Sequence, residues 1–481
     1  MICISVTPTS RTLAPADLLN ASRQGDLIEL CLDHFLKEPN IGELIKAVDK
    51  PILVSCRRPQ DGGQWNGTES ERLQLLRSAI VSGPAYVELD LDIAPGIPRF
   101  GTTKRVISFT SLNRPLGKID EIFEKCQAAN ADIVKVTWPT DNLDAAWPLL
   151  AAVTQPRALP VVGFGIGRSG TTFSLLGRRY GSPWIYAALE RGMEAFDQQP
   201  TVWQLKEEYH FEDINSKTRF LGIVGYGTAE NTAARVLNAA FQELDKPIRC
   251  LPLIPGDVSR LPKMLSTMKI NGLIIDPAYM TSMSTFAGPG DETAQKTGCM
   301  DVLTERKDGW KGVSTLMQAI DVAGQQVTNT PEWASRGSVL VVGHTAFAKA
   351  AALYFGSKGA AVSLASASDN SAAGAARETG VRLVTWNAAH DVRADTLIIA
   401  ERGLACGTSK GELNPMIIRE RMNVVDLTSY PQESAFVEEA QARGARLISP
   451  SAIFASQLQM QFKLLAGREL PGTAFEAAAG M

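Results

Sequence analysis

The sequence has few histidines, no large excess of positive or negative charge and no long apolar run. Each of these absences argues against a class of function. Only four histidines are available for acid–base chemistry, and no spacing of cysteine and histidine resembles a zinc site. Lysine and arginine together number 48 against 51 aspartates and glutamates, and no basic tract is present, so neither nucleic acid nor a membrane is an expected partner. No apolar run has transmembrane length, and the first residues predict a strand rather than a signal peptide.

Cysteine is also scarce. The seven cysteines are scattered and odd in number, which is typical of reduced thiols and predicts a cytoplasmic protein. The length of 481 residues exceeds what one hydrophobic core holds, so about two or three domains are expected.

One predicted strand, Asp132–Trp138, carries a lysine in its middle. Apolar and β-branched residues flank Lys135, a pattern typical of a buried strand in a parallel sheet. A lysine in that position either extends to solvent at the strand end or lies desolvated with a lowered pKa. The second state provides a free amine that can form a Schiff base with a carbonyl substrate. The strand alone leaves both alternatives open.

Strands and helices alternate along the first part of the chain. Eight β/α units in about 210 residues predict a (β/α)8 barrel, in which chemistry gathers at the carboxyl ends of the strands. The predicted strands are Ile2–Pro8, Leu27–Asp33, Pro51–Arg57, Tyr86–Asp92, Lys104–Ser111, Asp132–Trp138, Leu159–Gly167 and Pro183–Leu189. Their carboxyl ends carry Glu29, Arg57, Asp61, Thr110, Lys135 and the loop around Arg168.

A charged stretch, Lys206–Lys217, then predicts a domain boundary and a solvated linker. A new α/β alternation follows, with a hairpin at Asp301–Thr315 and a strand–helix–strand unit starting at Ser338. This alternation predicts doubly wound α/β sheets.

Several segments of the first part resemble type I 3-dehydroquinate dehydratases. Asp26–Phe35 and Ser55–Gly63 are similar to that family's second- and third-strand motifs, and the strand of Lys135 falls where the family has its Schiff-base lysine. Leu176–Pro183 and Gln198–Pro200 continue the similarity. The resemblance implies dehydration of 3-dehydroquinate through an imine without a cofactor. It assigns catalytic roles to Lys135 and Asp61, and substrate contacts to Glu29, Arg57 and Gln199.

Other positions depart from the family pattern. Thr110 stands where the catalytic histidine is expected, Cys31 replaces a second-strand arginine, and Ser174 replaces the arginine that binds the substrate carboxylate. A hydroxyl cannot act as a base near neutral pH, and general acid–base catalysis contributes roughly 10²–10⁴-fold in rate. Imine formation is therefore expected to survive better than turnover. Arg168, Arg178 and Arg179 are candidates to replace the missing arginine.

The rest of the chain resembles shikimate dehydrogenase, in the order of the fused dehydratase–dehydrogenase proteins. Asn423–Ser434 and Phe454–Phe462 carry this similarity, and Gln457 falls on the substrate-binding glutamine. The resemblance divides the chain into a barrel at 1–212, a substrate lobe at 218–332 and a Rossmann-type lobe at 333–481 whose last helix returns to the substrate lobe. Met280 replaces the catalytic lysine, Leu316 its paired aspartate, and Asp301 an asparagine. The dehydrogenase half is thus predicted not to oxidise shikimate.

The predicted dinucleotide turn, Gly343–Ala348, keeps one glycine where a phosphate turn needs several. Gly343 and Thr345 are the residues left to contact NADP, so at most weak binding is predicted, and no metal site is expected. Three functions stay open: a barrel enzyme acting on a 3-dehydroquinate-like small molecule, the same barrel acting on another carbonyl substrate, or a non-catalytic protein that binds a metabolite or a partner. A homodimer is a further expectation from the resemblance.

Overall fold

The computed structural model describes residues 1–225, 228–285, 287–288, 290–335 and 337–479. The chain divides into two compact units, the first made of Met1–Tyr226 and Ala234–Met264 and the second of Gly227–Ala233 and Leu265–Met481. Among the described helices, none combines the length and the apolar character that crossing a membrane requires.

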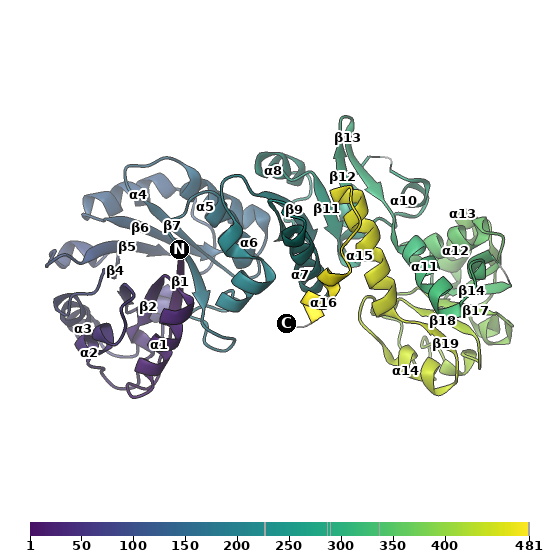
Figure 1. Ribbon diagram of the computed structural model, residues 1–481, viewed down its shortest axis with the longest axis horizontal. Coiled ribbons are helices and arrows are strands. Elements are labelled where there is room, and N and C mark those ends of the chain that lie inside the picture. The colour runs from purple at the N-terminus through teal and green to yellow at the C-terminus, as the bar shows by residue number, and fades with distance from the viewer. Residues whose placement is uncertain (226–227, 286, 289, 336, 480–481) are drawn as a thin grey trace. The chain divides into compact units, whose positions relative to one another are not determined.

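Eight parallel strands of the first unit form a barrel, which confirms the predicted (β/α)8 class (Figure 1). Neighbouring strands follow the order β7-β6-β5-β4-β3-β2-β1-β8, and β7 and β8 at its two ends also contact each other. Every predicted strand lies within two residues of an observed one. The strands are β1 Ile2–Val6, β2 Leu27–Cys31, β3 Ile52–Ser55, β4 Tyr86–Asp90, β5 Lys104–Thr110, β6 Ile133–Pro139, β7 Val161–Ile166 and β8 Ile185–Ala188.

Helices connect most of these strands, and local sequence fixes where they begin. Thr68 and Glu71 form a capping box at the start of α3, and the Asn142 side chain accepts from the backbone of Ala145 at the start of α5. The helices are α1 Ala14–Gln24, α2 Ile41–Lys46, α3 Glu69–Val81, α4 Ile119–Ala128, α5 Leu143–Thr154 and α6 Gly170–Arg179, with short turns η1 Leu32–His34, η2 Pro59–Asp61 and η3 Ala94–Gly96.

The prediction of a solvated linker at Lys206–Lys217 was wrong. A π-helical turn, η4 (Gln204–Glu208), and a 3-10 turn, η5 (Phe211–Asp213), occupy most of it, and Tyr209 and Phe211 are buried. The polar groups find partners within the same unit: Asn238 donates to the carbonyl of Glu208 at 2.7 Å. Burying the rings of Tyr209 and Phe211 favours a folded stretch, and the neighbouring charges of Glu207, Glu212 and Asp213 stay exposed to water.

The first unit also contains a parallel pair of strands, β9 (Arg219–Val224) and β10 (Ile248–Leu253). Helices α7 (Thr228–Glu243) and α8 (Leu261–Met268) contribute residues to both units.

The second unit holds an antiparallel group and a Rossmann-type sheet. The hairpin predicted at Asp301–Thr315 is confirmed as β12 and β13. The six parallel strands have the order β16-β15-β14-β17-β18-β19, which is the 3-2-1-4-5-6 order of dinucleotide-binding folds. The strands are β11 Gly272–Ile275, β12 Val302–Arg306, β13 Gly309–Val313, β14 Ser338–Val342, β15 Ala361–Ala365, β16 Arg382–Leu383, β17 Thr396–Ile399, β18 Asn423–Asp426 and β19 Arg446–Ile448.

The helices of the second unit cap and cover these strands. They are α9 Met280–Met283, α10 Glu292–Thr297, α11 Leu316–Thr328, α12 Ala346–Ser357, α13 Asp369–Thr379, α14 Ala435–Ala442, α15 Pro450–Ala466 and α16 Thr473–Ala479, with short turns η6 Pro277–Tyr279, η7 Trp333–Ser335, η8 Trp386–Asp391 and η9 Pro415–Ile417.

Candidate active site

Lys135 lies inside the barrel and not at a solvent-exposed strand end. It occupies β6, whose residues are nearly all buried, and only 1% of its surface is exposed. Its Nζ donates to Oε2 of Glu88 on β4 at 2.7 Å and lies 3.8 Å from Oε1 of Glu29 on β2. Of the two alternatives left open by the sequence, the structure therefore has the buried lysine, held as an ion pair with two carboxylates.

Glu29 is the second buried charge of this group. Its Oε2 accepts from the hydroxyl of Ser5 at 2.7 Å, and its Oε1 lies 3.8 Å from Nη1 of Arg57. Burial acts to raise the pKa of Glu29, but the charges of Arg57 and Lys135 outweigh burial and lower that pKa to about 2. Glu29 is thus a carboxylate at neutral pH.

Arg57 and Gln199 complete the group. Arg57 donates from Nη2 to the sulfur of Cys31 at 3.1 Å, and Gln199 donates from Nε2 to the hydroxyl of Ser5 at 3.2 Å. Four of the predicted barrel residues therefore come together with Glu88 and Ser5. We call this set the lysine cluster: Lys135, Glu29, Glu88, Arg57, Ser5 and Gln199.

The lysine cluster has buried polar atoms without a hydrogen-bond partner. These atoms are Oε1 of Glu29 and Nε and Nη1 of Arg57, and Oγ1 of Thr137 beside the cluster is another such atom. Thr137 is two residues beyond Lys135 on β6, so both side chains face the barrel interior. Buried polar atoms are normally paired with protein, water or ligand, so this region is suited to a polar guest.

Aromatic rings cover the lysine cluster. Tyr186 lies 4.5 Å from Lys135 Nζ, Phe164 packs on Tyr186 at 4.8 Å, and Phe196 packs on Phe164 at 5.0 Å between ring centres. The guanidinium of Arg57 lies 4.8 Å from the Phe196 ring. Phe196 also touches the loop after β3, because a Cβ at Gly62 would come within 2.2 Å of its Cε1.

Asp61 lies outside the lysine cluster. It ends η2, where its Oδ2 accepts from Nε of Arg58 at 2.6 Å. Within the described barrel, none of its hydrogen bonds or ion pairs reaches Lys135. Arg58 bonds Asp92 as well, so Asp61 is part of a rim of charges on the loops.

Hydroxyl groups line the strand where a histidine was expected. Ser108 is the β5 partner of Lys135, and Thr110 is the partner of Thr137. Among the four histidines, His34 lies in η1 at the carboxyl end of β2, with its Nε2 3.6 Å from Asp33. Burial lowers the pKa of His34, which favours the neutral imidazole.

No other arginine takes the place of the missing carboxylate clamp in the described barrel. Arg178 and Arg179 are in the last turn of α6, near the amino ends of the strands, and Arg178 donates to the carbonyl of Ile214. Arg168 is exposed on the loop before α6. Ser174 bonds back to the carbonyl of Gly170 within the same helix. Arg57 is therefore the guanidinium of the lysine cluster.

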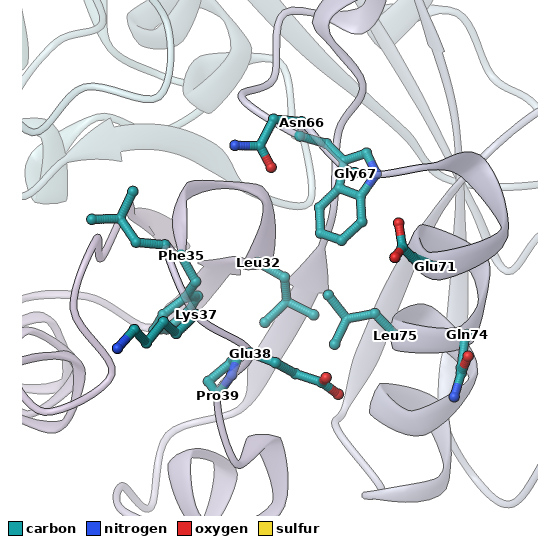
Figure 2. Close-up of a pocket in the computed structure, with 12 residues that line it drawn as sticks. Leu32, Phe35, Lys37, Glu38, Pro39, Asn66, Gly67, Glu71, Gln74 and Leu75 are labelled. Atoms are coloured by element: carbon teal, nitrogen blue, oxygen red, sulfur yellow. The ribbon is translucent and has the colours of Figure 1, made fainter.

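A hollow of about 290 Å³ lies beside the barrel strands, between the segment after β2 and the start of α3 (Figure 2). Leu32, Leu75 and Trp65 give it an apolar floor, and Lys37 and Glu38 stand at its edge. Its twelve lining residues include no member of the lysine cluster, so it is separate from that site.

A second candidate site lies in the second unit around Asp301. Its carboxylate is 1% exposed and accepts from the backbone of Thr315 at 3.0 Å, from the backbone of Leu316 at 2.9 Å and from Nε2 of Gln457 at 2.8 Å. The hydroxyl of Tyr430 donates to Oε1 of Gln457. Burial raises the pKa of Asp301 to about 6. Gln457 thus uses both ends of its amide on protein partners.

Comparisons with known proteins find similarity along the whole chain. Residues 2–216 match the type I 3-dehydroquinase family. The chloroplastic bifunctional 3-dehydroquinate dehydratase/shikimate dehydrogenase of Arabidopsis thaliana is 24% identical over 501 residues, which cover 98% of this chain and 83% of that protein. A 3-dehydroquinate dehydratase of Dehalococcoides mccartyi is 27% identical over 45% of this chain and 98% of its own length. The solved dehydroquinate dehydratase and shikimate dehydrogenase of S. pombe AroM is 16% identical, covers 99% of this chain and 98% of that one, and has a TM-score of 0.44.

The first part of the chain thus matches a type I 3-dehydroquinase, and the chain as a whole is similar to a fused 3-dehydroquinate dehydratase/shikimate dehydrogenase. Among the described residues of the second unit, the hydrogen-bond partners of Asp301 are all neutral. Met280 and Leu316, at the positions where the resemblance placed the catalytic lysine and aspartate, are buried apolar side chains. Nothing in this described network carries a positive charge that could exchange a proton with a substrate hydroxyl.

The turn after β14, where the sequence predicts dinucleotide binding, also has an unexpected partner. The backbone N–H of His344 donates to Oε2 of Glu401, just beyond β17, at 2.8 Å. Thr345 stands at the N-cap position of α12 without a side-chain capping bond, and its hydroxyl donates instead to the carbonyl of Ala400. A dinucleotide needs free amides here for its phosphates. The residues present therefore do not fit the phosphate groups of NADP, although Gly343 keeps the positive φ of 135° of a tight turn.

Two residues of these sites escaped the sequence analysis. Glu88 sits in the middle of a predicted strand, where a charged residue among buried neighbours is itself a signal of a paired or functional group. Glu401 lies 57 residues from His344, and no local pattern indicates that contact.

Proposed function

We propose that the barrel binds 3-dehydroquinate or a closely similar carbonyl compound as an imine on Lys135 and dehydrates it to 3-dehydroshikimate. The observation that supports this is a buried lysine 2.7 Å from one carboxylate and 3.8 Å from another, beside polar atoms that lack partners. Stability alone does not require this group, because replacing a whole buried ion pair by apolar residues of similar volume is often neutral or stabilising.

The first chemical step requires Lys135 to lose a proton. Glu88 is the acceptor at hydrogen-bond distance, so we assign it the proton from Nζ. The free amine adds to the substrate carbonyl carbon, and loss of the carbonyl oxygen as water leaves the C=N bond. The imine then acidifies the neighbouring carbon, whose proton departs as the β-hydroxyl leaves as water. Hydrolysis of the imine releases the product and restores Lys135.

Binding of the substrate falls to Arg57 and Gln199. Nη1 of Arg57 makes no hydrogen bond and lies 3.8 Å from Oε1 of Glu29, so it supplies a charged donor for a substrate carboxylate. Gln199 follows Phe196 in the segment after β8, and its amide already lies in the cluster, where Nε2 donates to Ser5 and Oε1 accepts from the backbone of Ala195. Phe196 has to leave the Arg57 guanidinium for a substrate to enter.

Turnover is expected to be slow. The carbon–proton step has no histidine in the lysine cluster to perform it, and the loss of a positioned acid–base group lowers rates by roughly 10²–10⁴-fold.

The covered mouth of the barrel favours a second candidate, a protein that binds the same metabolite without converting it. We assign no dehydrogenase activity to the other half, where Met280 stands in place of a lysine.

A cytoplasmic location is part of the proposal. All seven cysteines are free thiols, and six of them are buried, which suits a reducing compartment.

The test is formation of 3-dehydroshikimate from 3-dehydroquinate by the full chain, followed by the absorbance of the conjugated product. Slow turnover that is abolished in Lys135→Arg, which keeps the charge but cannot form this imine, would support the dehydratase. Glu88→Gln, whose amide oxygen can still accept from Nζ of Lys135, is expected to reduce turnover, and circular dichroism checks that the variant folds. Binding of 3-dehydroquinate without product, in calorimetry on the same preparation, would support the non-catalytic candidate, and neither binding nor product would refute both.

A further inference from the structure

The Rossmann-type sheet carries a negative charge where a dinucleotide would place its phosphates. Glu401 follows β17, and its Oε2 accepts from the backbone N–H of His344 at 2.8 Å. The same oxygen lies 3.1 Å from Nδ1 of the His344 ring. The turn after β14 thus already binds an anion, and that anion belongs to the chain.

The backbone holds this carboxylate close to the turn. Gly343 has a φ of 135°, and a Cβ added there would come within 3.0 Å of Glu401 Oε2 and of the Glu401 backbone nitrogen. The β14–β17 pairing continues to the ends of both strands, so Glu401 emerges directly beside Gly343. The contact therefore depends on the sheet and not on a loose surface side chain.

A cavity of about 290 Å³ opens beside this pair. Ser366 at the end of β15 lies 3.0 Å from Nδ1 of His344, while Trp386 and Leu404 supply apolar surface. The volume is at the lower end of the range for small-molecule pockets, about 300–1,000 Å³, which suits one ring system with a sugar better than a dinucleotide.

We propose that Glu401 acts as a built-in substitute for phosphate, and that this cavity takes an uncharged aromatic ligand with hydroxyl groups, of the size of a nucleoside, while rejecting its phosphorylated forms. The turn amide that would bind a phosphate is used, and the carboxylate repels a second anion. Hydroxyl groups have acceptors and donors in Glu401, His344 and Ser366, and the Trp386 ring offers a stacking surface. The inference concerns the second unit alone and does not depend on the function proposed for the barrel.

Calorimetry with adenosine and with ADP on the full chain tests it, because the two probes differ only by the phosphates. The wild type is expected to bind ADP at least about tenfold more weakly than adenosine, and Glu401→Gln is expected to reduce that ratio by about tenfold or more. The glutamine keeps an oxygen for the His344 amide, so the turn stays formed. Glu438→Gln, an exposed change of the same charge on α14, is the control and should leave the ratio unchanged.

Three results would overturn the proposal: ADP or NADP+ binding to the wild type more tightly than adenosine, a ratio that Glu401→Gln does not change, or no adenosine binding at millimolar concentration. If Glu401→Gln fails to fold by circular dichroism, added salt decides with the wild type. Salt screens the Glu401 carboxylate, so the difference in affinity between adenosine and ADP should decrease as ionic strength rises. A difference in affinity that salt leaves unchanged would refute the role of Glu401.

Discussion

Two buried carboxylates, one in each unit, behave in opposite ways. Glu29 in the barrel is 0% exposed and its pKa is lowered to about 2, whereas Asp301 is 1% exposed and its pKa is raised to about 6. Glu29 faces Arg57 and Lys135, but Asp301 is bound only by neutral donors from Thr315, Leu316 and Gln457. Burial favours the neutral acid at both sites, and hydrogen bonds to the carboxylate act against it at both. Burial is outweighed only at Glu29, where the charges of Arg57 and Lys135 are added.

The difference separates the two halves chemically. The barrel combines paired charges with buried polar atoms that make no hydrogen bond, among them Oε1 of Glu29 and Nη1 of Arg57. The network of Asp301 has satisfied its polar groups internally, and Met280 and Leu316 add only apolar surface. Three substitutions probe this contrast.

Lys135→Met would remove the cation from the barrel. Glu88 and Glu29 would then be buried charges short of a partner, so we expect a loss of about 3–5 kcal/mol in the free energy of unfolding at pH 7. Urea unfolding followed by circular dichroism measures it. Lys104→Met, which alters an exposed lysine of β5, should change stability by only about 0.5 kcal/mol. A loss of less than about 1 kcal/mol for Lys135→Met would mean that the buried pair is not formed.

Asp301→Asn would remove the titratable carboxyl group at position 301. Between about pH 4 and pH 6 the folded wild type holds a proton on Asp301 that the unfolded chain has released, so its stability falls as pH rises, by up to about 3 kcal/mol. The asparagine cannot titrate and should lack this decline. Glu29 has the opposite sign, because its stabilisation is present above its ordinary pKa of 4.5 and is lost as pH falls towards 2.

Urea unfolding at intervals from pH 4 to pH 7 measures this effect. Asp369→Asn on exposed α13 is the matched control and should keep the wild-type profile. If the free energy of unfolding changed with pH in the same way for the wild type and Asp301→Asn, ionising the Asp301 carboxyl would not destabilise the fold.

Gly62→Ala would disturb the cover of the barrel. Its φ of +82° strains any other residue, and the added Cβ would meet Phe196 at 2.2 Å. Gly83 has a similar φ of +75° but nothing within 4 Å of such a Cβ. Gly83→Ala therefore carries the backbone strain alone, about 1 kcal/mol, and the excess loss in Gly62→Ala reports the contact with Phe196. Thermal unfolding compares them, and equal losses would mean that the loop does not press on the ring.

Much of the fold follows from the sequence because strands and turns leave local patterns. The eight apolar runs of the barrel and the hairpin around Lys307–Gly309 are visible in this way. The stretch after β8 was misjudged because its charges outnumber Tyr209 and Phe211, yet those two rings decide its packing.

The sites are less predictable because they depend on distant contacts. Similarity to a family brought out Lys135, Glu29, Arg57 and Gln199, which the barrel does bring together. The sequence does not determine which way a side chain on a loop points, so it did not predict the pairing of Asp61 with Arg58. Glu88 and Glu401 act across strands, and their partners become apparent only when the sheets form.

Borohydride reduction in the presence of 3-dehydroquinate is the most direct test of the claim that Lys135 in the barrel forms an imine. Reduction of an imine would fix the ligand on the protein, and intact-mass analysis with peptide mapping would locate it. We expect one adduct, on Lys135, that is missing from Lys135→Arg. No adduct at saturating ligand, or an adduct on another lysine, would contradict the assignment of imine chemistry to this residue.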